Sequence, residues 1–222
     1  TVDGQLTEVR VWKVARTEAQ IRETLSRKLS GGEPGLLALW NFDRVENGVV
    51  KDATPGGNDG RLMGNARVVP GQPAALADSA PLERVLQLDG TNSFVELPRG
   101  LFTNQVITVE GWISWRSFRS YSRFFCLTEE VLDLSVYNRE ASSTLTVERL
   151  ERGGDGKVTG FTQMDLKGAL SPGQWCHLAI VCRTNSSKLY FNGVSISVPA
   201  VRSGGGFAGT PRGNFLGRGP HT

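Results

Sequence analysis

Residues 173–198 read GQWCHLAIVCRTNSSKLYFNGVSISV, and this stretch decides the fold class. It contains three short apolar runs separated by polar residues. The pair Asn192-Gly193 joins the second run to the third and is a strong signal for a two-residue β-hairpin, because both positions need a positive φ. In the third run, residues 194–198, valine and isoleucine alternate with serine. The stretch therefore predicts a hairpin with one buried and one solvated face.

Runs of the same kind recur along the rest of the chain, bounded by Gly, Pro, Asn and Asp. Leu6–Trp12 and Leu36–Phe42 are the first two, and Val106–Trp115 is the longest run of the central part. Many short strands with period-two patterning and turn residues between them are typical of a β-sandwich.

One segment has a helical pattern instead. Residues 15–29 read ARTEAQIRETLSRKL, in which Thr17 and Gln20 form a capping box. The pair Gly31-Gly32 then stops the helix. We expect a single connector helix over residues 17–29, lying on the edge of the sandwich.

Composition excludes two classes of partner. The chain has 222 residues, 25 Lys or Arg, 22 Asp or Glu and a net charge of +3. Proteins that bind a phosphate backbone usually carry a denser basic surface, and the most basic stretch, Arg116–Arg123, is better interpreted as an exposed strand–loop edge. No apolar run approaches the roughly 20 residues of a membrane helix. We therefore expect no nucleic-acid binding and no membrane insertion.

The three cysteines show no CxxC pair and no zinc-ligand spacing. Cys176 and Cys182 share one face of a strand but lie roughly 20 Å apart, so they cannot bridge each other. They are predicted to be small core residues. A disulfide from Cys126 to one of them is the alternative.

Five segments have a recognisable order between Gly35 and Gly219. They are GLLALWNFD with DATPGGNDGRL, then VLQLDGTNSFVELP, ITVEGWISW, GQWCHLAIVCRTNSSKLYFNG and NFLGRG. Together they resemble the laminin-G-like domains of the concanavalin A-like lectin/glucanase superfamily. The resemblance implies an all-β, two-sheet antiparallel jelly-roll β-sandwich.

The segment that normally ends such domains stands at the start of this chain, as GQLTEVRVWKVARTEAQI over residues 4–21. It is either the last strand of a preceding repeat or a strand that completes this domain, as in a circular permutation. We favour the second explanation, with Leu6–Trp12 pairing with Leu36–Phe42, because the sandwich would otherwise keep an open edge. Residues 1–222 then form one domain: 1–15 the last strand, 17–29 the connector helix and 35–222 the rest of the sandwich.

Glycosidases share this sandwich and need two carboxylates about 5–5.5 Å apart for retention of configuration. Glu130 and Asp133 are three residues apart and should face opposite sides of a strand, whereas Glu129 and Asp133 are a surface pair on an edge strand. The two histidines, His177 and His221, complete no catalytic constellation. We expect the protein not to be an enzyme, and a glycoside hydrolase is the last alternative.

The resemblance implies glycan or protein ligands and a calcium ion at one rim. Calcium prefers several hard oxygen ligands. The candidate ligands are Asp52 and Asp59 in DATPGGNDG, and Asp89 and Asn92 in LDGTNS. The alternative is that these residues only form turns.

A ligand-binding platform is predicted at the end of the run Val106–Trp115. Trp115 and Tyr121 offer flat apolar rings, and Arg116, Arg119 and Arg123 offer forked donors. The alternative is a solvated loop with Trp115 capping the sheet. We expect a non-catalytic binding or adhesion module that recognises carbohydrate, within a larger multidomain protein and outside the cytoplasm. A protein-interaction domain or a structural spacer is the alternative function.

Overall fold

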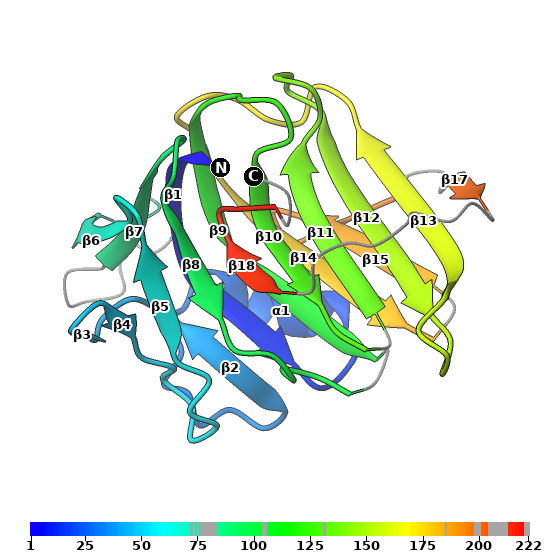
Figure 1. The fold of residues 1–222 in the computed structure, drawn as a ribbon, viewed down its shortest axis with the longest axis horizontal. Coiled ribbons are helices and arrows are strands. Elements are labelled where there is room, and N and C mark those ends of the chain that lie inside the picture. The colour runs from blue at the N-terminus through cyan, green and yellow to red at the C-terminus, as the bar shows by residue number, and fades with distance from the viewer. Residues whose placement is uncertain are drawn as a thin grey trace.

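The structure is a computed structural model (Figure 1). It describes residues 1–71, 73, 75, 84–103, 106–130, 132–184, 186–197, 201–203 and 213–219, so Val198 and His221 lie outside the described residues. Within these ranges the chain forms two antiparallel sheets and one helix, α1 (Glu18–Leu25). The predicted all-β sandwich with one connector helix is confirmed. No helix in the described ranges has the length and apolar character needed to cross a membrane.

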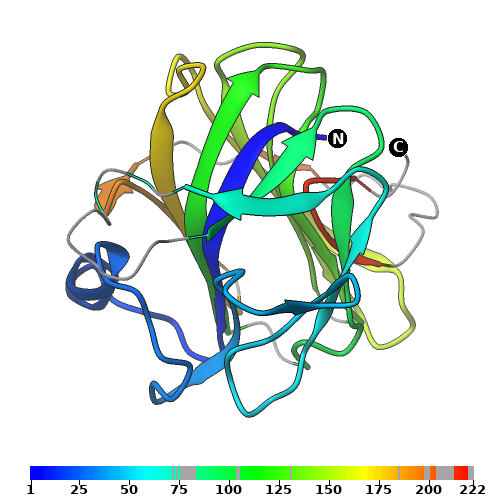
Figure 2. The same ribbon diagram turned by 90° about the vertical axis from the view of Figure 1, so that its left-hand side faces the viewer.

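Two sheets form the layers of the sandwich, as Figure 2 shows from the side. The first contains, in spatial order, β16 (Val194–Ile196), β15 (Ser186–Phe191), β14 (Trp175–Arg183), β9 (Ile107–Ser117), β1 (Asp3–Trp12), β7 (Arg84–Asp89) and β6 (Arg67–Pro70), with β2 (Leu36–Trp40) paired to β1. The second contains β17 (Val201–Ser203), β13 (Val158–Leu166), β12 (Leu145–Arg152), β11 (Leu132–Asn138), β10 (Arg123–Thr128), β18 (Asn214–Leu216), β8 (Phe94–Leu97), β5 (Gly60–Met63), β4 (Val49–Val50) and β3 (Val45–Glu46). We call them the β1 sheet and the β10 sheet.

The displaced N-terminal strand completes this sandwich. Strand β1 pairs antiparallel with β2, where Val9 is opposite Trp40, and this confirms the predicted pairing. Along its other side β1 pairs with β9, and its first residues also pair with β7 (Figure 1). It therefore lies inside the β1 sheet rather than at an edge.

A bulge in β1 directs charged side chains away from the core. Glu8 has a φ of 51°, and the register with β9 shifts between Thr7 and Arg10. As a result Leu6 and Val9 both belong to the central core. Arg10 instead donates to the backbone oxygen of Thr24 in α1, at 3.0 Å, on the outer face of the sheet.

Four buried charged residues meet beneath α1, and we call Glu8, Arg10, Arg16 and Glu110 the buried ion-pair cluster. Arg10 Nη2 lies 2.7 Å from Glu8 Oε2, and Arg16 Nη1 lies 2.8 Å from Glu110 Oε1. Each guanidinium in this cluster has a carboxylate partner, as buried charges require.

The helix is shorter than predicted and lies on a face of the sandwich, not on its edge. Its capping box at Thr17 is present, and Ser26 ends it. Ile21 packs against Ala179, Val181 and Tyr190 of β14 and β15. The edge position was wrong because the capping pattern predicts where the helix begins but not which surface Ile21 covers.

All three cysteines are buried free thiols, so the predicted core role of Cys176 and Cys182 is confirmed and the alternative disulfide is wrong. Burial raises the pKa of the Cys176 thiol to about 12.

Candidate functional site

The predicted platform residue Trp115 is not exposed. Its side chain is 1% exposed and belongs to the central core. Strand β9 continues to Ser117, and Trp115 is in phase with the core residue Ile113. The expectation of an exposed ring was wrong because the strand extends two residues beyond its predicted end, which keeps Trp115 on the inward-facing phase.

Arg116 has a partner within the chain. Its Nη1 lies 2.8 Å from Asp3 Oδ1, and the hydroxyl of Ser117 donates to Asp3 Oδ2 at 2.6 Å. This contact fixes the end of β9 to the start of β1, so the carboxylate of Asp3 neutralises Arg116.

The remaining predicted residues lie at one end of the β10 sheet, together with residues that the sequence analysis missed. Strand β8 begins at Phe94, β18 ends just before Arg218, and β10 begins at Arg123. Because these neighbouring strands are antiparallel, the three positions meet at the same edge. We call this region the arginine–aromatic rim; it contains Phe94, Arg119, Tyr121, Arg123, Tyr137, Phe215 and Arg218.

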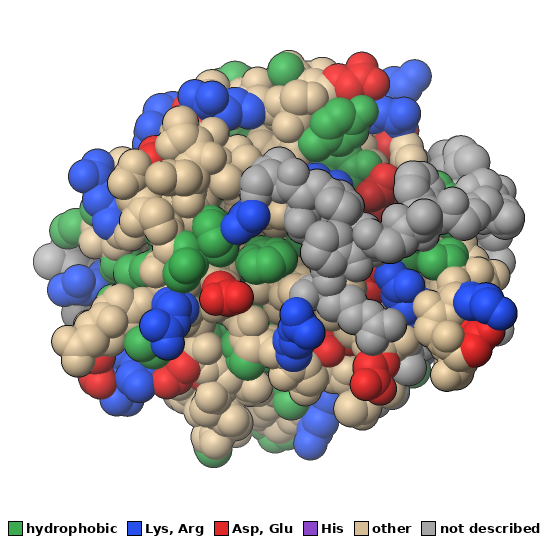
Figure 3. Space-filling view, in the orientation of Figure 1, with side chains coloured by type: hydrophobic (Ala, Val, Ile, Leu, Met, Phe, Trp, Pro, Cys, Tyr) green, Lys and Arg blue, Asp and Glu red, His purple; other side chains and the backbone are tan. Residues whose placement is uncertain are grey.

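The guanidinium groups of the rim stack on aromatic rings. Arg218 Cζ lies 4.4 Å from the ring centroid of Phe94 and 5.5 Å from that of Phe215. Arg123 Cζ lies 4.8 Å from the ring centroid of Tyr137. Figure 3 shows basic side chains among hydrophobic ones on this face of the molecule.

The aromatic rings of the rim also contact each other. The Phe94 and Phe215 rings meet edge to face, with centroids 5.8 Å apart, and the Tyr121 and Tyr137 centroids are 5.7 Å apart. Tyr121 is 41% exposed and has a φ of 54°. A left-handed conformation is uncommon and costly for a bulky residue, and such residues are enriched at functional sites.

The positive charges of the rim have no acidic partner in the part of the chain that the structure describes. Among the described residues, no ion pair involves Arg119, Arg123 or Arg218. The Nε atoms of Arg123 and Arg218 are buried and have no hydrogen-bond acceptor in the described part of the chain.

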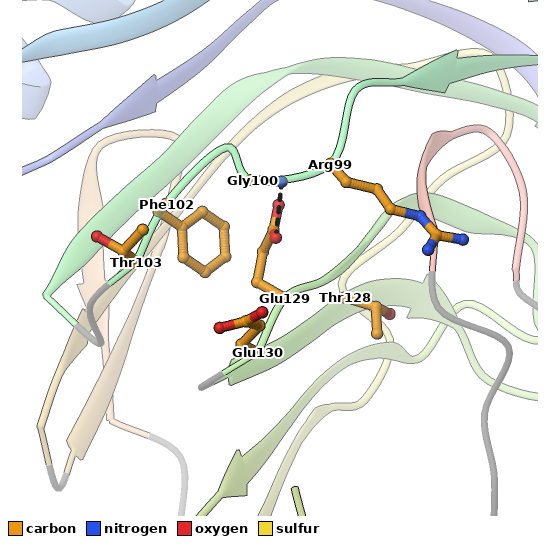
Figure 4. A pocket seen from close by; sticks show the side chains of 7 residues that line it. All are labelled: Arg99, Gly100, Phe102, Thr103, Thr128, Glu129 and Glu130. Carbon is orange, nitrogen blue, oxygen red and sulfur yellow. Dashed lines mark hydrogen bonds between the residues drawn. The ribbon is translucent and has the colours of Figure 1, made fainter. Parts of the chain in front are cut away.

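A cavity of about 290 Å³ lies at the opposite end of β10, lined by Arg99, Gly100, Phe102, Thr103, Thr128, Glu129 and Glu130 (Figure 4). Figure 4 shows the Glu129 side chain pointing to the backbone nitrogen of Gly100, from which it accepts a hydrogen bond at 2.9 Å. Glu129 also accepts from the Leu101 backbone and from Asn214 Nδ2, at 2.8 and 2.6 Å. This carboxylate therefore anchors the loop after β8.

The three carboxylates considered for a glycosidase, those of Glu129, Glu130 and Asp133, do not converge on one site. Asp133 forms an ion pair with Arg152 and is not among the residues that line the cavity. Glu129 and Glu130 do share the cavity, which the sequence analysis did not foresee. Both oxygens of Glu129 accept hydrogen bonds from the chain, so this carboxylate has a structural role in the loop after β8.

The predicted calcium ligands form turns. Asp52 accepts from the backbone nitrogens of Leu39 and Asn58, at 3.0 and 2.9 Å. The carboxylate of Asp59 binds Lys51 Nζ at 2.8 Å.

The second predicted calcium loop, LDGTNS, also forms a turn in which its aspartate accepts hydrogen bonds. Asp89 accepts from the Ser93 hydroxyl, which comes first among the causes that lower its pKa, and from Asn65 Nδ2. The backbone of Asn92 packs against Gly64. In the described ranges no group of three or more His, Cys, Asp or Glu side chains is arranged to hold a metal. The oxygens of Asp52, Asp59 and Asp89 are engaged within these loops, and calcium binding by the protein stays an untested prediction.

The sequence signal for the missed rim residues is weak but present. Phe94 lies in SFVELP and Phe215 and Arg218 in NFLGRG, two of the segments that carried the resemblance. Tyr137 ends the run LDLSVY. What could not be read is that these strand ends meet, because β8 and β18 are more than a hundred residues apart in the chain.

Comparison with known proteins agrees with this architecture. Domain 4 of AbnA, a GH43 extracellular arabinanase from Geobacillus stearothermophilus, has a solved structure in complex with arabinotriose. It is similar in fold, with a TM-score of 0.54, 21% sequence identity and coverage of 82% of each chain. No curated protein matches the sequence. The family model described as the concanavalin A-like lectin/glucanases superfamily matches residues 89–222, more than half of the chain. The protein therefore belongs to the concanavalin A-like lectin/glucanases superfamily.

Proposed function

We propose that this protein is a non-catalytic carbohydrate-binding module of a larger extracellular protein, and that the arginine–aromatic rim is its binding site. The observation that carries the proposal is the combination of partly exposed aromatic rings with guanidinium groups that have no acidic partner among the described residues. An aromatic ring can cover the apolar face of a sugar, and guanidinium donors can bind its oxygens.

The carboxylate geometry supports a binding role over a catalytic one. Glu129 holds a loop, and Asp133 is engaged by Arg152. We therefore expect no hydrolysis of arabinan or β-glucan. Release of reducing sugar that disappears in a Glu130→Gln variant would contradict the non-catalytic proposal, because Glu130 is the exposed carboxylate of the cavity.

Two likenesses support the choice of carbohydrate. The family includes lectins by its own description, and the structurally similar arabinanase domain was solved with arabinotriose. The extracellular location of that arabinanase is the basis for proposing the same location here.

The test is calorimetric binding to a panel of trisaccharides that includes arabinotriose, xylotriose and trigalacturonate. We expect at least one to bind, and Tyr121→Ala and Phe215→Ala each to weaken it by about tenfold, the size of a typical interface anchor. Val194→Ala is the matched control, because Val194 is 49% exposed on the other sheet. Binding that is unchanged in both aromatic variants, or no binding to any member of the panel, would overturn the proposal.

A further inference from the structure

The positive charge of the arginine–aromatic rim indicates which class of sugar it would bind. Elsewhere in the described structure, three buried arginines and the partly buried Arg152 have carboxylate partners: Arg10 pairs with Glu8, Arg16 with Glu110, Arg149 with Glu151 and Arg152 with Asp133. In the rim, Arg123 and Arg218 stand at the meeting ends of β10 and β18 and form no ion pair among the described residues. Neighbouring guanidinium charges repel each other, so an anion bound between them would relieve an unfavourable arrangement.

The nearest carboxylates are already engaged. Asp3 pairs with Arg116, and Asp89 accepts hydrogen bonds from Ser93 and Asn65. Glu96 stands next to Phe215 across the ladder, but Arg61 is opposite it on its other side. None of these carboxylates forms an ion pair with a rim arginine in the described part of the chain.

Stacking orients the donors before a ligand arrives. Arg218 lies against Phe94 and Phe215, Arg123 lies against Tyr137, and both arginines are partly buried. A guanidinium that contacts a ring loses rotamer freedom, and its planar fork of N–H groups matches a carboxylate in a bidentate contact. Less conformational freedom is then lost on binding.

The aromatic side chains place a sugar ring next to those donors. Tyr121 contacts Tyr137, and Arg123 donates to the Tyr121 backbone oxygen at 3.3 Å. An exposed ring, a guanidinium and a second stacked guanidinium thus follow one another along the edge of the β10 sheet.

From these contacts we propose that the rim binds an acidic oligosaccharide, with the carboxylate of a uronate residue held by Arg123 and Arg218 and its ring beside Tyr121. This inference rests on the proposed carbohydrate-binding function and names its ligand class.

The experiment compares trigalacturonate with its fully methyl-esterified form, which has the same sugars without the charge. We expect the acid to bind at least tenfold more tightly than the ester at low salt, and the difference to shrink between 50 and 500 mM NaCl as ions screen the contact. Arg218→Gln should weaken binding of the acid about tenfold, and Arg218→Lys should restore only part of the affinity because it lacks the fork. Arg44→Gln, an exposed arginine beside Glu46, is the control and should change nothing.

Two outcomes would overturn the inference. Equal affinity for the acid and the ester would contradict an acidic ligand but would leave the proposed carbohydrate binding intact. Tighter binding of dextran sulfate than of trigalacturonate would indicate a sulfated ligand instead of a uronate. If Arg218→Gln loses affinity for the acid and for the ester equally, the variant has a folding defect. Arg119→Gln, at an exposed position, then tests whether the positive charge of the rim contributes to binding. Failure of every glycan to bind would refute the proposed function itself.

Discussion

Two regions of this protein gather arginines, and they do so in opposite ways. Beneath α1, Arg10 and Arg16 are less than 7% exposed and each contacts a carboxylate. At the end of the β10 sheet, Arg123 and Arg218 stack on aromatic rings and form no ion pair within the described ranges.

The difference teaches how to tell a structural arginine from a ligand-binding one. A buried guanidinium is tolerated only when its charge and donors are satisfied, so the buried ion-pair cluster is closed and complete. A guanidinium that contacts an aromatic ring but has no carboxylate partner among the described residues keeps N–H donors that a ligand can use. Strand β1 connects the regions: Val2 donates to the Gly217 oxygen at 2.8 Å near the rim, and Arg10 lies under the helix.

Removing Arg10 should have the largest effect. The variant Arg10→Met leaves Glu8 buried beside only the Leu29 backbone donor, so we expect a loss of about 3–5 kcal/mol in the free energy of unfolding. Denaturant unfolding measures the change. The control Arg44→Met breaks an exposed pair with Glu46 and should cost at most about 1 kcal/mol. A loss of similar size in the two variants would remove the distinction between the regions.

Acid should destabilise the folded protein through His177, which lies beside Glu110 of the buried ion-pair cluster. Burial lowers the pKa of His177 to about 4, while its Nε2 lies 3.9 Å from Glu110 Oε2. Between pH 6.5 and 4 the unfolded chain binds this proton and the folded chain does not. The stability is therefore fully present above pH 6.5 and falls by about 3 kcal/mol as the pH drops to 4.

The matched variant is His177→Phe, which keeps a ring against Trp112. Its stability should depend less on pH in this window, since the titrating group is gone. Parallel stability curves for the two proteins from pH 7 to 4 would rule out His177 as the cause.

Gly4→Ala should disturb both regions through β1. An added Cβ at Gly4 would lie 2.1 Å from the backbone oxygen of Ser114 in β9, so the strands must separate. We expect a loss of about 1–3 kcal/mol in thermal unfolding, together with weaker binding at the rim. Gly154 has nothing within 4 Å of an added Cβ, and Gly154→Ala is the control that should lose no stability.

Arg218→Gln should have the smallest effect on stability. It removes a contact with the Phe94 ring but no ion pair among the described residues. The change in melting temperature should therefore correspond to a loss of at most about 1 kcal/mol in the free energy of unfolding. A loss comparable to that of Arg10→Met would mean that Arg218 is structural and that the rim is not poised for a ligand. The ligand test above and this measurement together separate the two roles.

Much of the fold could be predicted because its signals are local. Alternation in residues 194–196 and the Asn192-Gly193 pair predicted the β15–β16 hairpin, which is present with Leu189 opposite Ile196. The capping box predicted where α1 begins but not its end, because the turn after Leu25 is held by tertiary contacts such as the Leu29 nitrogen donating to Glu8.

The site was predicted only in part. Tyr121, Arg119 and Arg123 do lie together, but Trp115 is in the core and Arg116 is paired with Asp3. An exposed tryptophan and a buried one at a strand end differ by one position of register, and register depends on where β9 stops.

The sequence by itself determined the two-sheet sandwich, the pairing of Leu6–Trp12 with Leu36–Phe42 and the core role of Cys176 and Cys182, since period-two patterning and turn residues act over a few neighbours. Only the tertiary structure decided which strand ends meet. It brings Phe94, Arg123 and Arg218 to one edge and gives Arg10 a carboxylate while leaving Arg218 with a ring. Whether a charge is paired depends on pairing between distant strands, and that pairing is set by packing of the whole core rather than by any local pattern.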